Sequence, residues 1–467
     1  MSTSPLDPGR LSALVRDERD LFRALLTEWV AVPSVAGTPE HRDDVRRSAD
    51  WLARRCREAG FPEAQVVATG GSWAVTARWE AADPSAPTVL VYSHHDVRAA
   101  KPEEWTVTSP FQPVLRDGRL FGRGASDAKG QVLAHVRSVP LLLAATGASA
   151  PPVTLVLLVE GEEEMGSPGL EQALQEHLPD LRPDVVVFSD TLQWKAGEPA
   201  MCTSVRGMVS AHLEVGGTER DVHSGATSGA APNAALALAE LLARLHDERG
   251  GIALPGFDET VPAIAPERRA ELAELSFSEE DWLRRSSTRL IRGEEGYSVL
   301  ERLWERPSLE LVGLIAGDPT GMSRAVLPSA ASADLSIRTV PGQPVHDAVE
   351  TLRAFVRENL DPELRCEISV ASETAQEGYR TPWTWRSDAL ERAMRAGYGV
   401  PVIKRMGNAG GGPAELLARR FGVPVLFFGT GLPEDHWHDS DESADLEELL
   451  RGTAVLAHLW DELAVSR

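Results

Sequence analysis

The sequence predicts an α/β protein in which a doubly wound domain with a mostly parallel sheet is interrupted by an inserted α+β domain. Three observations predict this architecture. The 467 residues are enough for two sizeable cores. Apolar strands alternate with helical segments in the first and last parts of the chain. In the middle part of the chain, strands and helices no longer alternate. We therefore expect one discontinuous domain, 1–206 with 374–467, and an inserted domain, 207–373.

The first part of the chain opens with two amphipathic helical patterns, about 11–30 and 42–59. Val153–Glu160 is almost continuously apolar, as expected for a strand that is covered on both faces of a parallel sheet. The other elements expected here are strands at 88–92 and 184–189 and helices at 130–145 and 169–177.

The inserted part begins near Gly207, where Met208–Val215 alternates between apolar and polar residues like a half-buried strand. A long helix is expected over Asn233–Arg249, followed by charged, loop-like segments from Gly250 to Gly296. Further strands (309–315, 331–338, 366–371) and a helix (344–358) complete an antiparallel α+β domain.

The α/β alternation resumes in the last part of the chain. The expected elements are a helix at 387–396, a strand at 402–405, a helix from Pro413, a strand at 423–428 and a final helix from Ala444.

Composition narrows the function. The 47 Lys and Arg against 70 Asp and Glu give a formal charge of −23, which argues against a nucleic-acid partner. No secretory signal is visible after Met1, and the most apolar short run, Val153–Val159, is too short to cross a membrane. The three cysteines are widely spaced, so we expect a reducing, cytoplasmic location. No CxxC pair exists, so a metal would need His and carboxylate ligands.

Candidate ligands follow the predicted strands. His94 and Asp96 follow the first strand, Glu162–Glu164 the second and Asp190 the third, while His436 and His438 lie beyond the last. Asp127 precedes the helix that begins at Gly130. Because ligands bind at the carboxyl ends of strands in such sheets, five segments direct His or carboxylate groups to one edge.

Each residue alone has a simpler interpretation: a surface histidine, a solvated acidic loop, a helix cap or a turn. Together, the carboxylates would repel one another unless a cation lay among them. Two histidines and three carboxylates around two divalent ions leave one positive charge, which a bridging hydroxide neutralises. Sulfur-free ligands of this kind suit catalytic zinc, with cobalt or manganese as alternatives. A further carboxylate is needed to move protons.

Five segments carry a family resemblance: Tyr92–Val97 (YSHHDV), Gly122–Gly130 (GRGASDAKG), Glu160–Ser167 (EGEEEMGS), Ser189-Asp190, and His438–Glu442 (HDSDE). In this order they resemble motifs of the two-zinc exopeptidase family of bacterial carboxypeptidases, aminoacylases, succinyl-diaminopimelate desuccinylases and carnosinase-like dipeptidases. The resemblance covers nearly the whole chain and is closest to the dipeptidase branch.

The resemblance implies a role for each residue. It implies two divalent metal ions per subunit, held by His94, Asp127, Glu164, Asp190 and His438, with Asp127 bridging both. It also implies that Asp96 orients His94 and that Glu163 acts as general base and then acid. His436 competes with His438, but only His438 is followed by Asp-Glu three and four residues later.

The inserted domain resembles the family's lid. Asp221–Gly225 resembles the motif whose histidine, here His223, polarises the scissile carbonyl, often across a dimer formed through the lid. Leu335–Pro341 resembles the strand whose arginine, here Arg338, holds the substrate carboxylate. Gly410, Gly411 and Gly412 resemble a carboxylate-binding loop before a helix. The alternatives are a turn histidine, a surface ion pair and a plain glycine-rich turn.

The chain departs from the family pattern at four places: Ala128 in the bridging motif, Asn408-Ala409 before the glycines, Gly412 after them, and Ala325 before Val326-Leu327-Pro328. Most of these lie where the resemblance places substrate contacts, so they bear on substrate identity rather than on metal chemistry.

The expected function is hydrolysis of the amide bond of a dipeptide or N-acyl amino acid by metal-activated water. N-acyl amino acid deacylation or desuccinylation is the alternative within hydrolases. An ATP-dependent ligase that uses Gly407–Pro413 for phosphates is a remote one, since no GKS or GKT follows the glycines. A non-catalytic metal-binding scaffold would leave Glu163 and Asp96 without a purpose.

Overall fold

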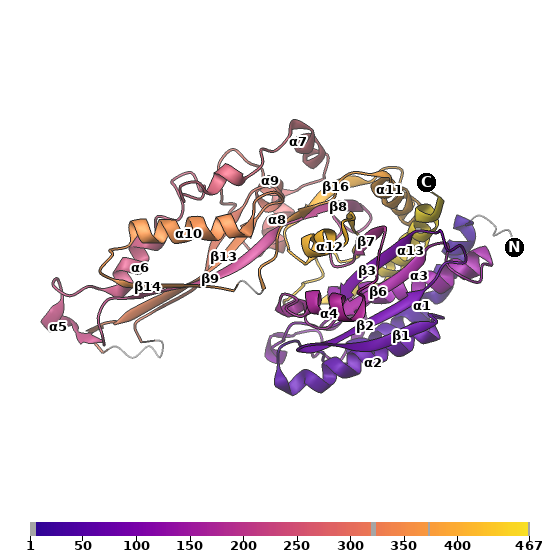
Figure 1. The fold of residues 1–467 in the computed structure, drawn as a ribbon, viewed down its shortest axis with the longest axis horizontal. Helices are drawn as coiled ribbons and strands as arrows, with labels where there is room; N and C mark the ends of the chain where they lie inside the picture. The colour runs from indigo at the N-terminus through magenta and orange to yellow at the C-terminus, as the bar shows by residue number, and fades with distance from the viewer. Residues whose placement is uncertain (1–5, 319–323, 372–373, 466–467) are drawn as a thin grey trace. The chain divides into compact units, whose positions relative to one another are not determined.

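A six-stranded sheet forms the centre of the first of two compact units (Figure 1). The computed structural model describes residues 6–318, 324–371 and 374–465. Within these, unit 1 comprises the chain up to Thr203, Thr381–Met406 and the chain from Gly412, and unit 2 comprises Ser204–Arg380 and Gly407–Gly411.

The central sheet of unit 1 is mixed. Its order is β1-β2-β6-β3-β7-β17; β6, β3, β7 and β17 run parallel, and the β1-β2 hairpin pairs with β6 antiparallel. The sequence analysis did not predict this hairpin. The strands are β1 (Glu63–Thr69), β2 (Ser72–Trp79), β3 (Thr88–His94), β6 (Thr154–Glu160), β7 (Val185–Phe188) and β17 (Val425–Phe427).

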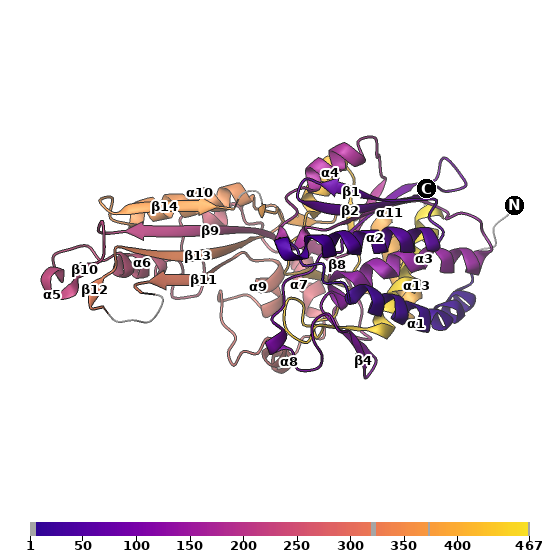
Figure 2. The ribbon, with the colours of Figure 1, turned by 90° about the horizontal axis from the view of Figure 1, so that it is seen from below.

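Helices cover both faces of this sheet. Figure 2 shows α1, α2, α3 and α13 on one face, where they share an apolar core with strand residues such as Val89, Val91 and Val187. Trp29 of α1 stacks on Trp51 of α2 within this core. The helices of unit 1 are α1 (Pro8–Val30), α2 (Arg42–Glu58), α3 (Gly130–Thr146), α4 (Leu170–His177), α11 (Trp385–Tyr398), α12 (Ala414–Phe421) and α13 (Leu446–Val465).

Two small three-stranded sheets supplement the central one. The first, in the order β18-β5-β4, joins β4 (Val114–Arg116) and β5 (Arg119–Phe121) to β18 (Ser443–Asp445). It pairs the segment before Asp127 with the segment after His438. The second, in the order β15-β8-β16, contains β8 (Ala200–Val205), β15 (Tyr379–Arg380) and β16 (Lys404–Asn408).

Unit 2 is built on an antiparallel sheet in the order β11-β13-β9-β14. Alternate residues of β9 and β13 pack against α6 and α10 in one core, and the opposite face is polar. The elements are β9 (Gly207–Gly216), β11 (Ser308–Ala316), β13 (Ala330–Thr339), β14 (Arg365–Val370), α6 (Ala234–Leu242) and α10 (Val345–Asn359). A two-stranded sheet of β10 (Val222–His223) and β12 (Val326–Leu327) precedes α5 (Ser224–Thr227).

Two expectations for unit 2 were wrong in detail. The helix expected over Asn233–Arg249 ends at Leu242, because Asp247 accepts hydrogen bonds from the N–H groups of Arg249 and Gly251 and so forms a turn. The stretch expected to be loop-like contains two short helices, α7 (Pro266–Ala273) and α8 (Glu279–Arg285); α9 (Val299–Trp304) follows it. Both α7 and α8 are rich in charged residues, so their sequences lack the apolar periodicity that predicts a helix.

Candidate metal centre

Three neighbouring parallel strands end at the candidate centre. His94 is the last residue of β3, Asp190 lies two residues after β7, and Glu163 and Glu164 begin a 3₁₀ turn just after β6. Because β6, β3 and β7 are adjacent and parallel, their carboxyl ends meet at one edge of the sheet. Asp127 comes from the segment before α3, and His438 from the loop between β17 and β18.

The structure brings these side chains into two groups that share Asp127. In the first, His94 Nε2 lies 3.1 Å from Asp127 Oδ1 and 3.6 Å from Asp190 Oδ1. In the second, His438 Nε2 lies 3.0 Å from Asp127 Oδ2 and 3.2 Å from Glu164 Oε2. Each group offers ligand atoms within 4.8 Å of one another, so each could hold one metal ion. Among the described residues, His436 belongs to neither group.

The two oxygens of Asp127 face different histidines, which is the arrangement that a bridging carboxylate requires. Asp127, Asp190, Glu164 and His94 are buried, and the side chain of His438 is half exposed. The Asp127–Ala128 peptide bond is cis. With Ala128 at this position, both ligand groups are present.

Electrostatics at the centre favour cations. Burial raises the pKa of Asp190 above its usual value, and the nearby charge of Asp127 adds to this effect against His94. Burial acts to raise the pKa of Asp127, but contacts with His438 and His94 bring it well below its usual value. Asp190 Oδ1 is buried and has no hydrogen-bond partner within the described residues. A divalent cation would supply that partner, so the donor set fits a metal.

Asp96 supports both His94 and the loop after β6. It is fully buried; its main-chain oxygen lies 3.1 Å from His94 Nδ1, and its carboxylate Oδ1 lies 3.4 Å from the same nitrogen. Its two carboxylate oxygens accept hydrogen bonds from the N–H groups of Glu163 (3.3 Å) and Glu164 (3.0 Å). One carboxylate therefore orients a histidine on one strand and the acidic pair on the next.

Glu163 has the properties of a proton acceptor. Burial raises its pKa well above the usual value, and the charges of Asp190, Glu164 and Asp96 add to this effect, while His94 opposes it. A carboxyl group whose pKa is raised in this way is suited to accept a proton.

Glu442 is a supporting residue that sequence analysis had noted only as a marker of the His438 motif. Its buried carboxylate accepts hydrogen bonds from the N–H groups of Gly124, Ser126 and Asp127 at 3.0–3.1 Å, and from Arg123 Nη1 at 2.8 Å. It joins the segment of His438 to the segment of Asp127. Only the pairing of segments more than 300 residues apart reveals this role.

Most of the residues expected to bind substrate fall into two places in unit 2, whereas one, Gly412, belongs to unit 1. A Cβ atom at Gly411 would lie 3.8 Å from Arg338 Nη1, so Gly411 and Arg338 are neighbours. His223 is exposed and pairs with Val326, beyond the Ala330 end of β13, whereas Arg338 lies near the other end of that strand. Gly412 lies in unit 1, where a Cβ atom would meet the ring of Phe188 at 2.5 Å.

An open α/β sheet with two His-carboxylate groups that share one aspartate defines a metal-dependent hydrolase. The chain belongs to peptidase family M20/M25/M40, whose model matches residues 90–462. The predicted family resemblance, the α/β fold class and the enzyme class are therefore confirmed.

Similar proteins extend along the whole chain. The Cys-Gly metallodipeptidase dug1 of Schizosaccharomyces pombe is 26% identical, over 97% of this chain and 98% of its own. The human Beta-Ala-His dipeptidase is 28% identical over 99% and 95%. The crystal structure of human carnosine dipeptidase 1 superposes with a TM-score of 0.82 at 25% identity and covers 98% of this chain and all of its own. That of the dipeptidase Dug1p from Saccharomyces cerevisiae gives 0.83 at 23% identity, over 98% and 99%.

Proposed function

We propose that this chain is a dipeptidase that hydrolyses the amide bond of a dipeptide with two metal ions and Glu163 as the general base. The observation that carries the proposal is the pair of His-carboxylate groups that share Asp127 at the carboxyl ends of β3, β6 and β7. The dipeptidases among its relatives support the choice of a dipeptide. In this proposal unit 1, predicted as residues 1–206 and 374–467, is the catalytic domain, and unit 2 is the lid.

The proposal assigns each metal-binding residue to one or both of the two metal ions. His94 and Asp190 would hold one metal ion, His438 and Glu164 would hold the other, and Asp127 would contribute to both groups. Zinc suits the donor set best, with cobalt or manganese as alternatives. When bound, such a pair lowers the pKa of a water molecule towards about 7 and polarises the scissile carbonyl.

The protein side chains then move the protons. Glu163 takes the proton of the attacking water and passes it to the leaving amine. Asp96 keeps Glu163 in place through the backbone hydrogen bond and orients His94. Arg338 binds the carboxylate of the substrate with a planar pair of donors, assisted by the N–H groups of Gly410, Gly411 and Gly412.

Glu163→Gln is the direct test of the proton transfer. We expect the variant to bind metal like the wild-type protein and to lose at least 100-fold in kcat, since a carboxamide cannot accept the proton. Glu171→Gln, on the exposed face of α4, is the matched control and should keep full activity. Near-normal turnover of Glu163→Gln with metal bound would exclude this base.

We further propose that His223 stabilises the oxyanion in the partner subunit of a dimer. Within unit 2, β13 separates Arg338 from the Ala330 end near His223 by roughly 26 Å, at about 3.3 Å per residue. A dipeptide cannot span that length, so His223 and Arg338 of one subunit would not serve the same substrate.

The lid offers an apolar edge for such a dimer. Strand β11 is the edge of its sheet, and Val312 and Ile315 on it are 66% and 55% exposed. Unpaired apolar edges of this kind favour association. Val312→Lys with Ile315→Lys should give monomers in sedimentation equilibrium, while Glu367→Lys on the opposite edge strand β14 should not. A wild-type monomer at working concentration would refute the dimer.

Two finer points complete the proposal. A panel of dipeptides and N-acyl amino acids would separate a dipeptidase from a deacylase. We also propose a cytoplasmic location, which the three cysteines support, since none of them forms a disulfide. Within the described residues, no helix is long and apolar enough to cross a bilayer.

A further inference from the structure

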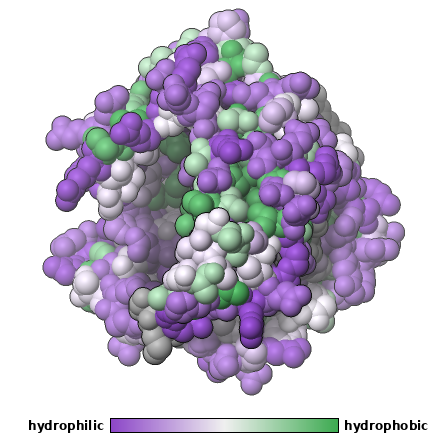
Figure 3. Space-filling model, turned by 90° about the vertical axis from the view of Figure 1, so that its left-hand side faces the viewer, coloured by the Kyte–Doolittle hydropathy of each residue, from purple (hydrophilic) through white to green (hydrophobic). Residues whose placement is uncertain are grey.

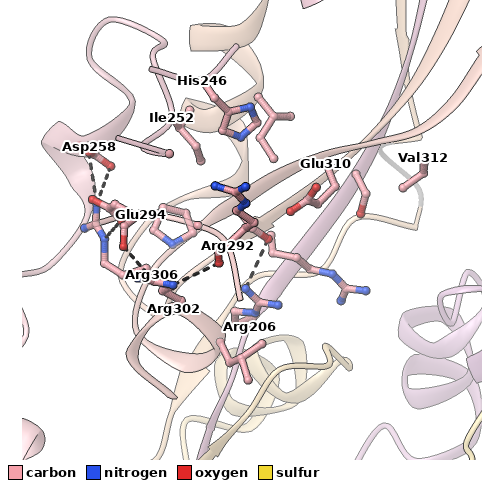
Figure 4. Close-up of a pocket in the computed structure, with 18 of the residues that line it drawn as sticks. Arg206, His246, Ile252, Asp258, Arg292, Glu294, Arg302, Arg306, Glu310 and Val312 are labelled. Carbon is pink, nitrogen blue, oxygen red and sulfur yellow. Dashed lines mark hydrogen bonds and ion pairs between the residues drawn. The ribbon is translucent and has the colours of Figure 1, made fainter. Parts of the chain in front are cut away.

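A cavity of about 570 Å³ in unit 2 is lined by an unusual number of arginines. Figure 4 shows four of them, Arg206, Arg292, Arg302 and Arg306, around the cavity, and Arg338 is the fifth. The acidic residues that line it are Asp258, Glu294 and Glu310. Five guanidinium groups against three carboxylates leave two positive charges in a chain whose formal charge is −23. The face of the molecule drawn in Figure 3 is largely hydrophilic, with smaller hydrophobic areas.

Two of the three carboxylates are already paired. Arg306 contacts Asp258 at 3.2 Å and Glu294 at 2.6 Å. Arg302 instead donates to the backbone oxygens of Glu294 (2.8 Å) and Arg292 (3.1 Å). These contacts make one wall of the cavity rigid and leave neither Asp258 nor Glu294 available to the remaining arginines.

Arg206 and Arg338 are the uncompensated pair. Arg206 is 8% exposed, and among the residues that the structure describes its guanidinium donates only to the oxygen of Ala409 (3.1 Å) and to Ser308 Oγ (3.4 Å). Ser308 is the cross-strand partner of Arg338, so the two guanidinium groups lie beside the same point of the sheet. Within the described residues, the backbone of Arg338 pairs in the sheet, but its guanidinium has no hydrogen bond or ion pair to a side chain.

The pKa values reflect this arrangement. Burial, and then the charge of Arg338, lowers the pKa of Arg206 to about 10, while Glu310 opposes the shift. Burial also lowers the pKa of Arg338. Arg206 is buried and Arg338 is half-buried, so the two neighbouring cations repel each other and lose hydration. An anion bound in the cavity would relieve this cost. One bound carboxylate would offset the charge of only one of these two arginines.

We propose that this cavity is a subsite for a second carboxylate, and that the preferred substrates are dipeptides with a carboxyl-terminal Glu or Asp. The inference rests on the proposed function, in which Arg338 binds the α-carboxylate. The side-chain carboxylate then binds Arg206 and makes a charge-assisted bond that a neutral side chain cannot make. The volume suits such a small ligand.

The test compares Ala-Glu with Ala-Gln, which have the same shape and differ in one charge. On the metal-loaded enzyme we expect kcat/KM for Ala-Glu to exceed that for Ala-Gln at least tenfold, mainly through KM. Arg206→Met should remove this preference, so that the ratio of kcat/KM for Ala-Glu to that for Ala-Gln falls to about one. The matched control, Arg353→Met on the exposed face of α10, should keep the preference.

Calorimetry with glutarate and butyrate provides a readout that needs no catalysis. Glutarate should bind the wild-type holoenzyme at least tenfold more tightly than butyrate and should compete with Ala-Glu. Equal kcat/KM for the two dipeptides, or glutarate binding that does not compete, would overturn the subsite and leave the proposed function intact. If no dipeptide is hydrolysed but Arg206→Met still abolishes glutarate binding, the dipeptidase proposal fails and the anion site stands.

Discussion

Replacing Glu442 with Gln should weaken both the fold around Asp127 and the metal centre. The carboxylate of Glu442 is fully buried and is the common acceptor for three N–H groups of the segment from Gly124 to Asp127. It also pairs with Arg123, whose side chain is 3% exposed. The carboxamide keeps the size of the side chain but removes its charge and one acceptor oxygen.

The expected loss of stability depends on the acceptors that Arg123 keeps in the variant. Without the carboxylate, the buried guanidinium of Arg123 keeps the oxygen of Asp439, at 3.1 Å, as an acceptor. Removal of one partner of a buried ion pair typically costs about 3–5 kcal/mol, because the other charge stays buried and unpaired. The same change loosens the peptide that carries Asp127, and loss of a supporting group around metal ligands lowers metal affinity about 10–100-fold.

Two assays check this prediction. Urea-induced unfolding of the metal-free protein measures the loss of stability, and a competition titration with a chelating dye measures metal affinity. Glu434→Gln, an exposed residue of the same loop, is the control and should match the wild-type protein in both assays. If Glu442→Gln unfolded at the wild-type urea concentration and bound metal with wild-type affinity, the reasoning about this carboxylate would be refuted.

Three further predictions follow from burial and charge. Burial lowers the pKa of His135 to about 3, so the unfolded chain binds a proton that the folded chain does not, and stability falls as the pH drops from about 6.5 towards 3. His135→Leu should therefore unfold at lower pH than the wild-type protein in an acid titration followed by circular dichroism; an unchanged acid midpoint would contradict this. A thiol reagent at pH 8 should modify only the exposed Cys366 in the native protein and all three cysteines in denaturant, since Cys56 and Cys202 are buried and burial raises the pKa of Cys56 to about 12; rapid labelling of Cys56 in the native state would count against it. A chelator should lower the melting temperature and abolish activity, and added zinc should restore both, because the two ligand groups exist only in the folded chain; a melting temperature that does not respond to chelator and zinc would argue against metal binding there.

Much of the metal centre could be read from local sequence. His94, Asp190 and the acidic pair Glu163-Glu164 follow apolar strands directly, and the carboxyl ends of parallel strands meet at one sheet edge. Helices with clear apolar periodicity, such as α1 and α10, were likewise predicted close to their observed limits. The β1-β2 hairpin and the short charged helices α7 and α8 were missed, because their burial depends on distant segments rather than on their own residue pattern.

The sequence by itself determined the fold class, the family and the donor set of the metal centre, because these depend on residue type, spacing and the periodicity of apolar residues. Only the tertiary structure decided that Glu442 holds the Asp127 segment, and that Arg206 lies beside Arg338 with no ion pair to a carboxylate among the described residues. Contacts between side chains far apart in the chain are set by how the elements pack, and no local pattern encodes that packing.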